Sequence, residues 1–283
     1  MLLSITWDVS PAIVEILGRE IRWYGLLWAS ALFLTAFIVQ KMYKHENLPE
    51  KWFDSLFIYV ATGLIIGARL GHCLFYDPVY YLSAPWEMLK IWEGGLSSHG
   101  GAIGMLIGIT LYSKKVTKRS VIWALDRLIV GVGLGATAIR VGNLFNHEIY
   151  GGPTDMPWGF RFVTNIHSWM KGAEPIYSVP SHPTQIYEAL IYFCTFLLGM
   201  YMYWVKDLGK KQGLILGVSL ICIFFSRFMI EFIKNLQEEF EIDMVATYGI
   251  NMGQLLSIPF IIWGIWLVWN ALKKGNSTLS TKK

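Results

Sequence analysis

The sequence predicts an all-α, polytopic membrane protein with seven transmembrane helices and a cap segment outside the membrane. The 283 residues are 54% hydrophobic and only 16% charged, and the mean hydropathy is +0.44. These values are too apolar for an ordinary soluble protein of this length. There are 13 tryptophans, many of them near the ends of apolar runs, as in the aromatic belts at bilayer interfaces.

Apolar runs of about 20 residues, the length needed to cross a bilayer, recur along the chain. Seven such runs cover residues 22–41, 53–76, 96–113, 121–141, 184–205, 213–233 and 251–272. No repeat or linker interrupts the pattern, so we expect residues 1–283 to form a single domain.

The connecting segments differ in their content of Lys and Arg. Segments 41–51, 114–119, 206–211 and 273–283 hold 14 of the 24 basic residues, and the alternate segments, counted with Arg22 at the edge of the first run, hold six. Because basic segments favour the cytoplasmic side, the N-terminus should lie outside and the C-terminus inside, which requires an odd number of crossings. The long segment 142–183, rich in Gly and Pro, should then cap the outer membrane surface.

Composition also argues against several other classes of protein. The net charge of +4 is spread over short loops, so no nucleic-acid partner is expected. Cys73, Cys194 and Cys222 lie in apolar runs without metal-type spacing, and we expect neither a disulfide nor a metal site. The first 20 residues lack a basic leader region and are expected to belong to the mature protein.

Ionisable side chains inside the predicted spans gather in the outer half of the membrane, where such groups usually mark function. They comprise three arginines, two carboxylates, one histidine and a nearby tyrosine: Arg69, Arg140, Arg227, Glu188, Glu231, His99 and Tyr24. Guanidinium groups converging at one site favour a planar oxyanion such as phosphate. At a bilayer surface, this phosphate would belong to a phospholipid.

Plainer interpretations exist for parts of this set. Arg69 could pair with a backbone carbonyl, and Glu231 could form an intrahelical ion pair with Arg227 four residues earlier. Spans two and three also carry glycines at every fourth position, which would allow close helix packing. These are Gly63, Gly67 and Gly71, and Gly100, Gly104 and Gly108.

The stretch "RVGNLFNHEIYG", residues 140–151, resembles the signature Arg-x-Gly-Asn-x-x-Asn-x-Glu-x-x-Gly of the prolipoprotein diacylglyceryl transferases of bacterial inner membranes. The matching positions are Arg140, Gly142, Asn143, Asn146, Glu148 and Gly151. Family-like stretches flank it, including "IRWYGLLWA", "GARLGHCLFYDP", "GGLSSHGGAIG", "SHPTQIYEAL" and "SRFMIEFIK". One departure is Ile139, where the family usually has glycine.

The resemblance implies a seven-span enzyme of the bacterial inner membrane with its active site facing the periplasm. It implies transfer of the diacylglyceryl group of phosphatidylglycerol to the lipobox cysteine of a prolipoprotein. Glycerol phosphate leaves and a thioether forms. No cofactor is required.

The reaction suggests roles for the polar residues. A cysteine thiol, with a pKa of about 8.5, needs a nearby base, and His99 is our candidate. Arg140 and Arg227 are candidates to stabilise the departing phosphate. The predicted substrate-binding residues are Tyr24, Arg69, Gly100, Gly101, Gly142, Asn143, Asn146, Glu148, Gly151, His182 and Glu231.

Two other functions remain open from the residues alone. A multi-span transporter or lipid-binding scaffold would use the polar cluster for translocation or docking, but it should show a polar path through the membrane. A different lipid-processing enzyme usually carries acid-rich metal motifs, which the sequence lacks.

Overall fold

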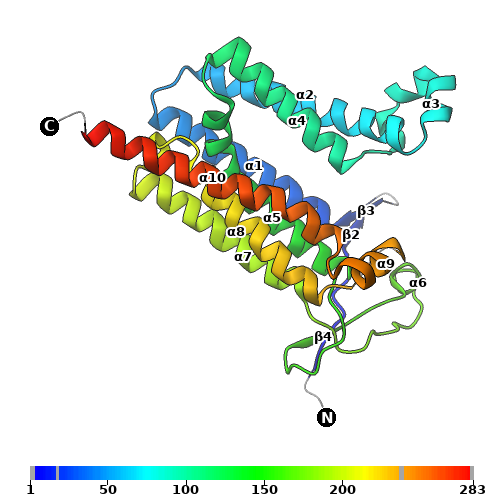
Figure 1. Ribbon diagram of the computed structural model, residues 1–283. Helices are drawn as coiled ribbons and strands as arrows, with labels where there is room; N and C mark the ends of the chain where they lie inside the picture. Colours follow the sequence, from blue (N-terminus) through cyan, green and yellow to red (C-terminus); the bar gives the residue numbers. More distant parts are fainter. Residues whose placement is uncertain (1–3, 17–18, 236–238, 281–283) are drawn as a thin grey trace. The chain divides into compact units, whose positions relative to one another are not determined.

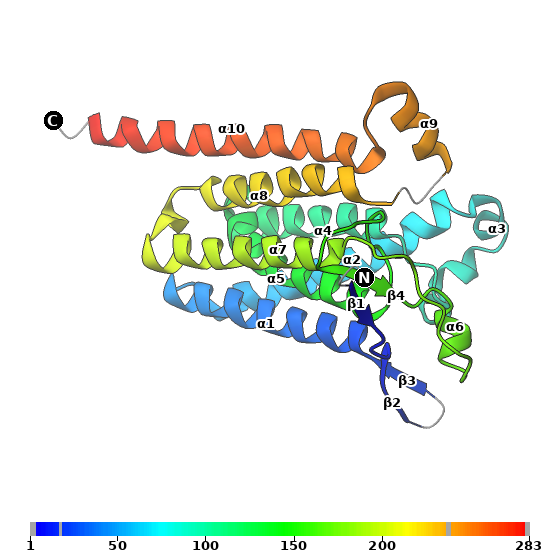
Figure 2. The ribbon, with the colours of Figure 1, turned by 90° about the horizontal axis from the view of Figure 1, so that it is seen from below.

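The computed structural model describes residues 4–16, 19–235 and 239–280, and these are mostly helical (Figures 1 and 2). The chain divides into two compact units. The large unit contains residues 1–35 and 128–283, and the small unit contains residues 36–127. The boundaries between the units fall within the sequences of two long helices, α1 (Trp23–His45) and α5 (Val121–Phe145).

The large unit is built on apolar helices. Helices α7, α8 and α10 lie side by side in both views (Figures 1 and 2). Their apolar outer faces suit a lipid environment, because side chains such as Phe33 and Ile262 are 73% and 61% exposed. The long helices are α1 (Trp23–His45), α5 (Val121–Phe145), α7 (Thr184–Met200), α8 (Leu214–Ile230) and α10 (Met252–Ser280).

Short strands that the sequence does not predict lie at one end of the large unit. Strand β1 (Ser4–Trp7) pairs in parallel with β4 (Gly159–Phe162), and β2 (Ala12–Ile16) pairs antiparallel with β3 (Arg19–Arg22). Strands of four or five residues give too short an alternation to stand out in a sequence dominated by apolar helices. Two short helices complete this end: α6 (Ile166–Trp169) and α9 (Glu239–Tyr248).

A small aromatic core holds the segment after α5 in place. Phe160 and Phe162 are buried with Leu144, and Trp7 and Tyr150 pack against them. The ring of Tyr150 stacks on Phe162 at 4.6 Å between centroids. This core joins the N-terminal strand to the end of α5, where the signature begins.

The small unit is organised around the contact between α2 (Glu50–Phe75) and α4 (Ser98–Tyr112), which lie side by side in Figure 1. The glycines do allow close packing, as the sequence predicted. A Cβ atom at Gly67 would stand 2.4 Å from Gly100 O, and one at Gly104 would stand 2.1 Å from Gly63 O. Backbone therefore meets backbone here. Helix α3 (Pro78–Ser83) follows α2.

Six helices in the described residues are long and apolar enough to cross a membrane. They fall in six of the seven predicted runs. The run 96–113 forms α4, which has 15 residues and continues as a π-helical turn, Ser113–Thr117. Because α4 alone is shorter than the usual span of about 20 residues, the seventh crossing stays a prediction.

Candidate active site

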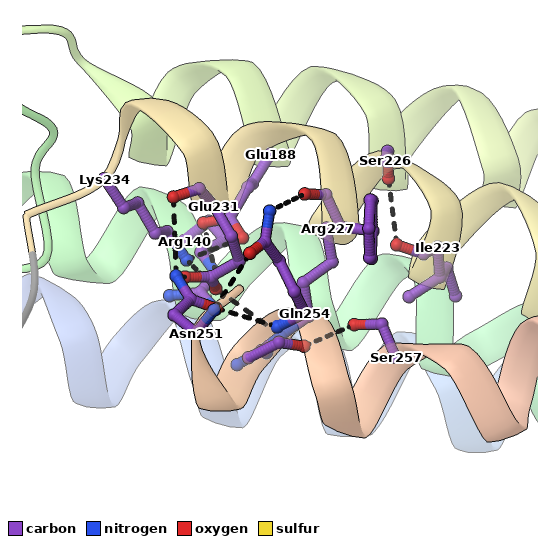
Figure 3. A network of polar contacts seen from close by, with 12 residues as sticks. Arg140, Glu188, Ile223, Ser226, Arg227, Glu231, Lys234, Asn251, Gln254 and Ser257 are labelled. Atoms are coloured by element: carbon purple, nitrogen blue, oxygen red, sulfur yellow. Dashed lines mark hydrogen bonds and ion pairs between the residues drawn. The ribbon is translucent and has the colours of Figure 1, made fainter. Parts of the chain in front are cut away.

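A chain of alternating positive and negative side chains occupies one end of the large unit (Figure 3). Arg140 Nε lies 3.0 Å from Glu188 Oε2, and Lys234 Nζ lies 3.1 Å from Glu188 Oε1. Lys234 Nζ also lies 3.2 Å from Glu231 Oε1, which is 3.7 Å from Arg227 Nε. We call these five residues the ion-pair chain. It connects two arginines that are 87 positions apart in sequence.

The ends of several helices supply these side chains. Arg140 lies in the last turns of α5 and Glu188 in the second turn of α7. Arg227 and Glu231 are four residues apart at the end of α8, so they lie on one face of the helix. The intrahelical pair that the sequence allowed is therefore present, and it belongs to a larger set of charges.

Residues at the start of α10 hold Glu231. Asn251 Nδ2 donates to Glu231 Oε2 over 3.2 Å. Asn251 Oδ1 accepts a hydrogen bond from Gln254 N, and Gln254 Oε1 accepts one from Asn251 N. This reciprocal arrangement is a capping box that fixes the helix start. Asn251, Gln254 and Lys234 are not among the predicted site residues, although the pattern Asn-x-x-Gln at the start of an apolar run is a signal of this cap.

The signature segment connects to the ion-pair chain through amide side chains. Arg140 Nη1 donates to Asn143 Oδ1 over 3.3 Å. The Nδ2 groups of Asn143 and Asn146 both donate to Glu148 Oε1, over 2.8 and 3.0 Å. Each of these amide groups carries a second N–H. Their predicted role as donors to a lipid head group stays a prediction.

The backbone around Glu148 is strained. His147 and Ile149 have φ values of +55° and +58°, and this left-handed region is unusual for a β-branched residue such as Ile149. Side chains of α7 hold this conformation, since Gln185 donates to Glu148 O over 2.8 Å and Thr184 donates to Ile149 O over 3.0 Å. Strain of this kind is often found at functional sites.

His147 is buried and held at both ring nitrogens. Its Nδ1 accepts a hydrogen bond from Val163 N over 3.1 Å, and its Nε2 lies 3.0 Å from Val9 O. An accepting Nδ1 requires the neutral ring, with Nε2 as the donor. Burial lowers the pKa of His147 below its ordinary value.

Gly151 lies where three segments cross. Its N–H donates to His182 O over 2.8 Å, and it forms a bridge with Lys234. A Cβ atom here would stand 2.5 Å from Ile233 O, so only glycine fits. The ring of His182 faces Tyr187, with Nδ1 3.3 Å from the hydroxyl oxygen. Gly151 thus joins the signature to the end of α8.

Gly142 allows close approach of Tyr24, because a Cβ atom at Gly142 would stand 2.6 Å from Tyr24 Cδ2. In the structure, the group that approaches this glycine is therefore the Tyr24 ring. The two predicted residues lie together in the large unit.

The other predicted site residues lie in the small unit. Arg69 is 4% exposed, and its guanidinium donates to four backbone carbonyls. The acceptors are Glu87 O at 2.6 Å, Met88 O at 2.9 Å, Gly94 O at 2.6 Å and Gly95 O at 3.2 Å. Pairing with carbonyls, the plainer interpretation of Arg69, is what the structure shows.

His99 is exposed at the second position of α4. Ser97 caps that helix by accepting a hydrogen bond from Gly100 N. Gly100 and Gly101 face α2, so in the structure their neighbours are protein atoms. Their contact with substrate, and a joint site of His99 with Arg140, stay predictions.

The two arginines of the ion-pair chain retain unused donors. Within the residues that the structure describes, Arg140 Nη2 and both Nη atoms of Arg227 have no hydrogen-bond acceptor. Arg227 is 37% exposed and Arg140 13%. This end of the large unit can therefore bind an oxyanion through guanidinium N–H groups.

Comparisons with known proteins show the family of this chain. A sequence profile described as "Prolipoprotein diacylglyceryl transferase" matches residues 11–270. Proteins named phosphatidylglycerol–prolipoprotein diacylglyceryl transferase are similar to this chain. The relative from Porphyromonas gingivalis is 51% identical, covering 95% of each chain. That from Chloroherpeton thalassium is 41% identical, also covering 95% of each. That from Bacteroides fragilis is 42% identical, covering 97% of this chain and 98% of the relative.

The matched region contains both the signature and the ion-pair chain. The chain belongs to the prolipoprotein diacylglyceryl transferase family.

Proposed function

We propose that this protein transfers the diacylglyceryl group of phosphatidylglycerol to the lipobox cysteine of prolipoproteins. The observation that carries the site assignment is the ion-pair chain, which brings Arg140 and Arg227 to one end of the large unit with unused Nη donors. Family membership supports the substrates, since the relatives are named for both phosphatidylglycerol and prolipoprotein.

The charges of the reaction explain why arginines are needed. The thiolate sulfur attacks the glycerol carbon that carries the phosphate, and the carbon–oxygen bond breaks. The phosphodiester carries one negative charge, and the glycerol phosphate leaves with two. The charge of the thiolate thus passes to the phosphate, where guanidinium groups stabilise it most in the transition state. The thiol proton goes to a base, for which we propose His99.

An apolar groove lined in part by sequence neighbours of Arg140 suits a lipid substrate. The groove has a volume of about 340 Å³ and runs between α5 and α7. Val141 and Leu144, close to Arg140 in sequence, line it with Ile186 and Phe193. Such a surface could accept an acyl chain while the head group meets the arginines.

We also propose the membrane arrangement expected from the sequence. The protein would cross the bacterial inner membrane seven times, with α4 as the additional crossing, the N-terminus and active site on the periplasmic side, and the C-terminus in the cytoplasm. Segment 142–183 would form the periplasmic cap, and residues 1–283 would act as one domain. The unequal distribution of Lys and Arg supports this orientation.

A transfer assay tests the function. Purified protein would be incubated with phosphatidylglycerol labelled in its acyl chains and a lipobox peptide, and thioether product would be measured. The peptide with its cysteine changed to serine is the substrate control. We expect product with the wild type and little with Arg140→Ala or His99→Ala. An inactive wild type would contradict the function, and full activity of either variant would contradict its assigned role.

A further inference from the structure

Lys234 is the central cation of the ion-pair chain (Figure 3). Its side chain is only 7% exposed, and its Nζ contacts one oxygen each of Glu188 and Glu231. Its backbone is held by the bridge to Gly151. A lysine this deeply buried is normally paired, and this one is paired with two carboxylates.

The sum of the formal charges in the ion-pair chain depends on Lys234. Glu188 and Glu231, with side chains 0% and 10% exposed, would neutralise the two arginines. Lys234 raises the sum for the ion-pair chain to one positive charge. Glu148 lies outside this count, because it is exposed and contacts amide groups rather than a cation.

Lys234 also determines how the carboxylates meet the arginines. Each carboxylate gives its Oε1 to Lys234, and the Oε1 of Glu188 also accepts from the Tyr192 hydroxyl over 3.3 Å. The closest arginine contacts are made through Nε, at 3.0 Å to Glu188 Oε2 and 3.7 Å to Glu231 Oε1. A carboxylate without this competitor would favour a bidentate pair that also uses an Nη atom. Lys234 thereby keeps Nη donors available.

We propose that Lys234 is a positioning residue that gives the arginine pair a surplus of one positive charge and keeps its Nη atoms directed to a phosphate. A single surplus charge matches the phosphodiester of phosphatidylglycerol, which carries one negative charge. The proposal rests on the proposed function for the identity of this phosphate. It adds a residue that makes no contact with the substrate itself.

Two substitutions at position 234 separate charge from packing. Lys234→Met keeps an unbranched side chain but removes the charge, and we expect the inhibition constant of glycerol phosphate and the KM for phosphatidylglycerol to rise at least about tenfold. Lys234→Arg keeps the charge and should stay within about threefold of the wild type. Lys171→Met, at an exposed position of the same unit, is the control and should change neither constant.

The double variant Lys234→Met with Glu188→Gln is the decisive test. It restores a surplus of one charge, from two arginines and Glu231, so glycerol phosphate affinity should recover most of the loss. If Lys234 merely supports the fold, the double variant will bind no better than Lys234→Met. That result, or an unchanged inhibition constant in Lys234→Met, would overturn the proposal.

A binding measurement keeps this test independent of the proposed function. Protection of each folded variant against heat by glycerol phosphate can be followed without any transfer reaction. Should the wild type transfer no diacylglyceryl group yet be protected in a manner that depends on Lys234, the function would be wrong and the charge assignment right. No protection of the wild type would overturn the charge assignment itself.

Discussion

Arg140 and Arg69 look alike in the sequence, since each lies near the outer end of a predicted membrane span, but the structure uses them differently. Arg140 contacts a carboxylate and an amide and retains an Nη group without an acceptor. Arg69 directs its donors to four carbonyls of one loop. The environment of a guanidinium, rather than its depth, separates a candidate anion ligand from a structural residue.

The two units also differ in how freely their main contacts can adjust. The α2–α4 contact is made by backbone at glycines, where nothing can move aside. The ion-pair chain is made by long side chains around an exposed arginine, which can adjust when an anion binds. We therefore expect substitutions in the α2–α4 contact to act on stability and those in the ion-pair chain to act on transfer.

The largest expected effect is on transfer, at Arg140. Arg140→Lys keeps the charge but loses the planar fork, and we expect the transfer rate to fall by about 100-fold. The rate with phosphatidylglycerol vesicles and a lipobox peptide would be measured beside the unfolding temperature. If Arg140→Lys lost stability in proportion to its loss of transfer rate, Arg140 would be a structural residue, as Arg69 is in this structure.

Substitution of a glycine in the α2–α4 contact should act next most strongly, and on stability. A side chain at Gly104 would stand 2.7 Å from Gly67 Cα and even closer to Gly63 O, so Gly104→Val should destabilise the protein by about 3 kcal/mol. Gly135→Ala is the matched control, because nothing lies within 4 Å of its Cβ position. Thermal unfolding in detergent measures both, and equal unfolding temperatures would contradict the close contact.

Arg69 should show a smaller effect, again on stability. Arg69→Lys cannot reach all four carbonyls, and we expect a loss of about 2 kcal/mol with faster proteolysis of residues 87–95. Transfer should fall far less than in Arg140→Lys. A large fall in rate with unchanged stability would instead show that Arg69 contacts substrate.

The sequence predicted the helical spans well, because apolar runs of membrane length have few alternatives. It also predicted that Arg140, Arg227 and Glu231 belong together. It did not find Lys234 or Asn251, since these lie at the edges of the apolar runs and gain their roles from segments far away in sequence. Nor could it show that Arg69 binds carbonyls, because the loop that supplies them is positioned by the fold.

The smallest expected effect concerns pH and the buried ring of His147, which supports the strained end of the signature. Burial lowers its pKa in the folded protein below the unfolded value of about 6.5. Between these two values the unfolded chain binds more protons, so stability should be complete above about pH 6.5 and fall as the pH drops. One proton gives a slope of at most about 1.4 kcal/mol per pH unit.

Unfolding temperatures between pH 5 and pH 7 check this expectation, and exposed His167 provides the comparison. His147→Gln should lower stability, since the glutamine amide cannot make both hydrogen bonds of the ring. It should also reduce the fall of the unfolding temperature between pH 7 and pH 5. His167→Gln should leave the profile unchanged. If the wild-type slope survived in His147→Gln, other groups would carry the acid sensitivity. The hydrogen bonds of His147 would then keep its ring neutral, but protonation of the ring in acid would not measurably lower the stability of the protein.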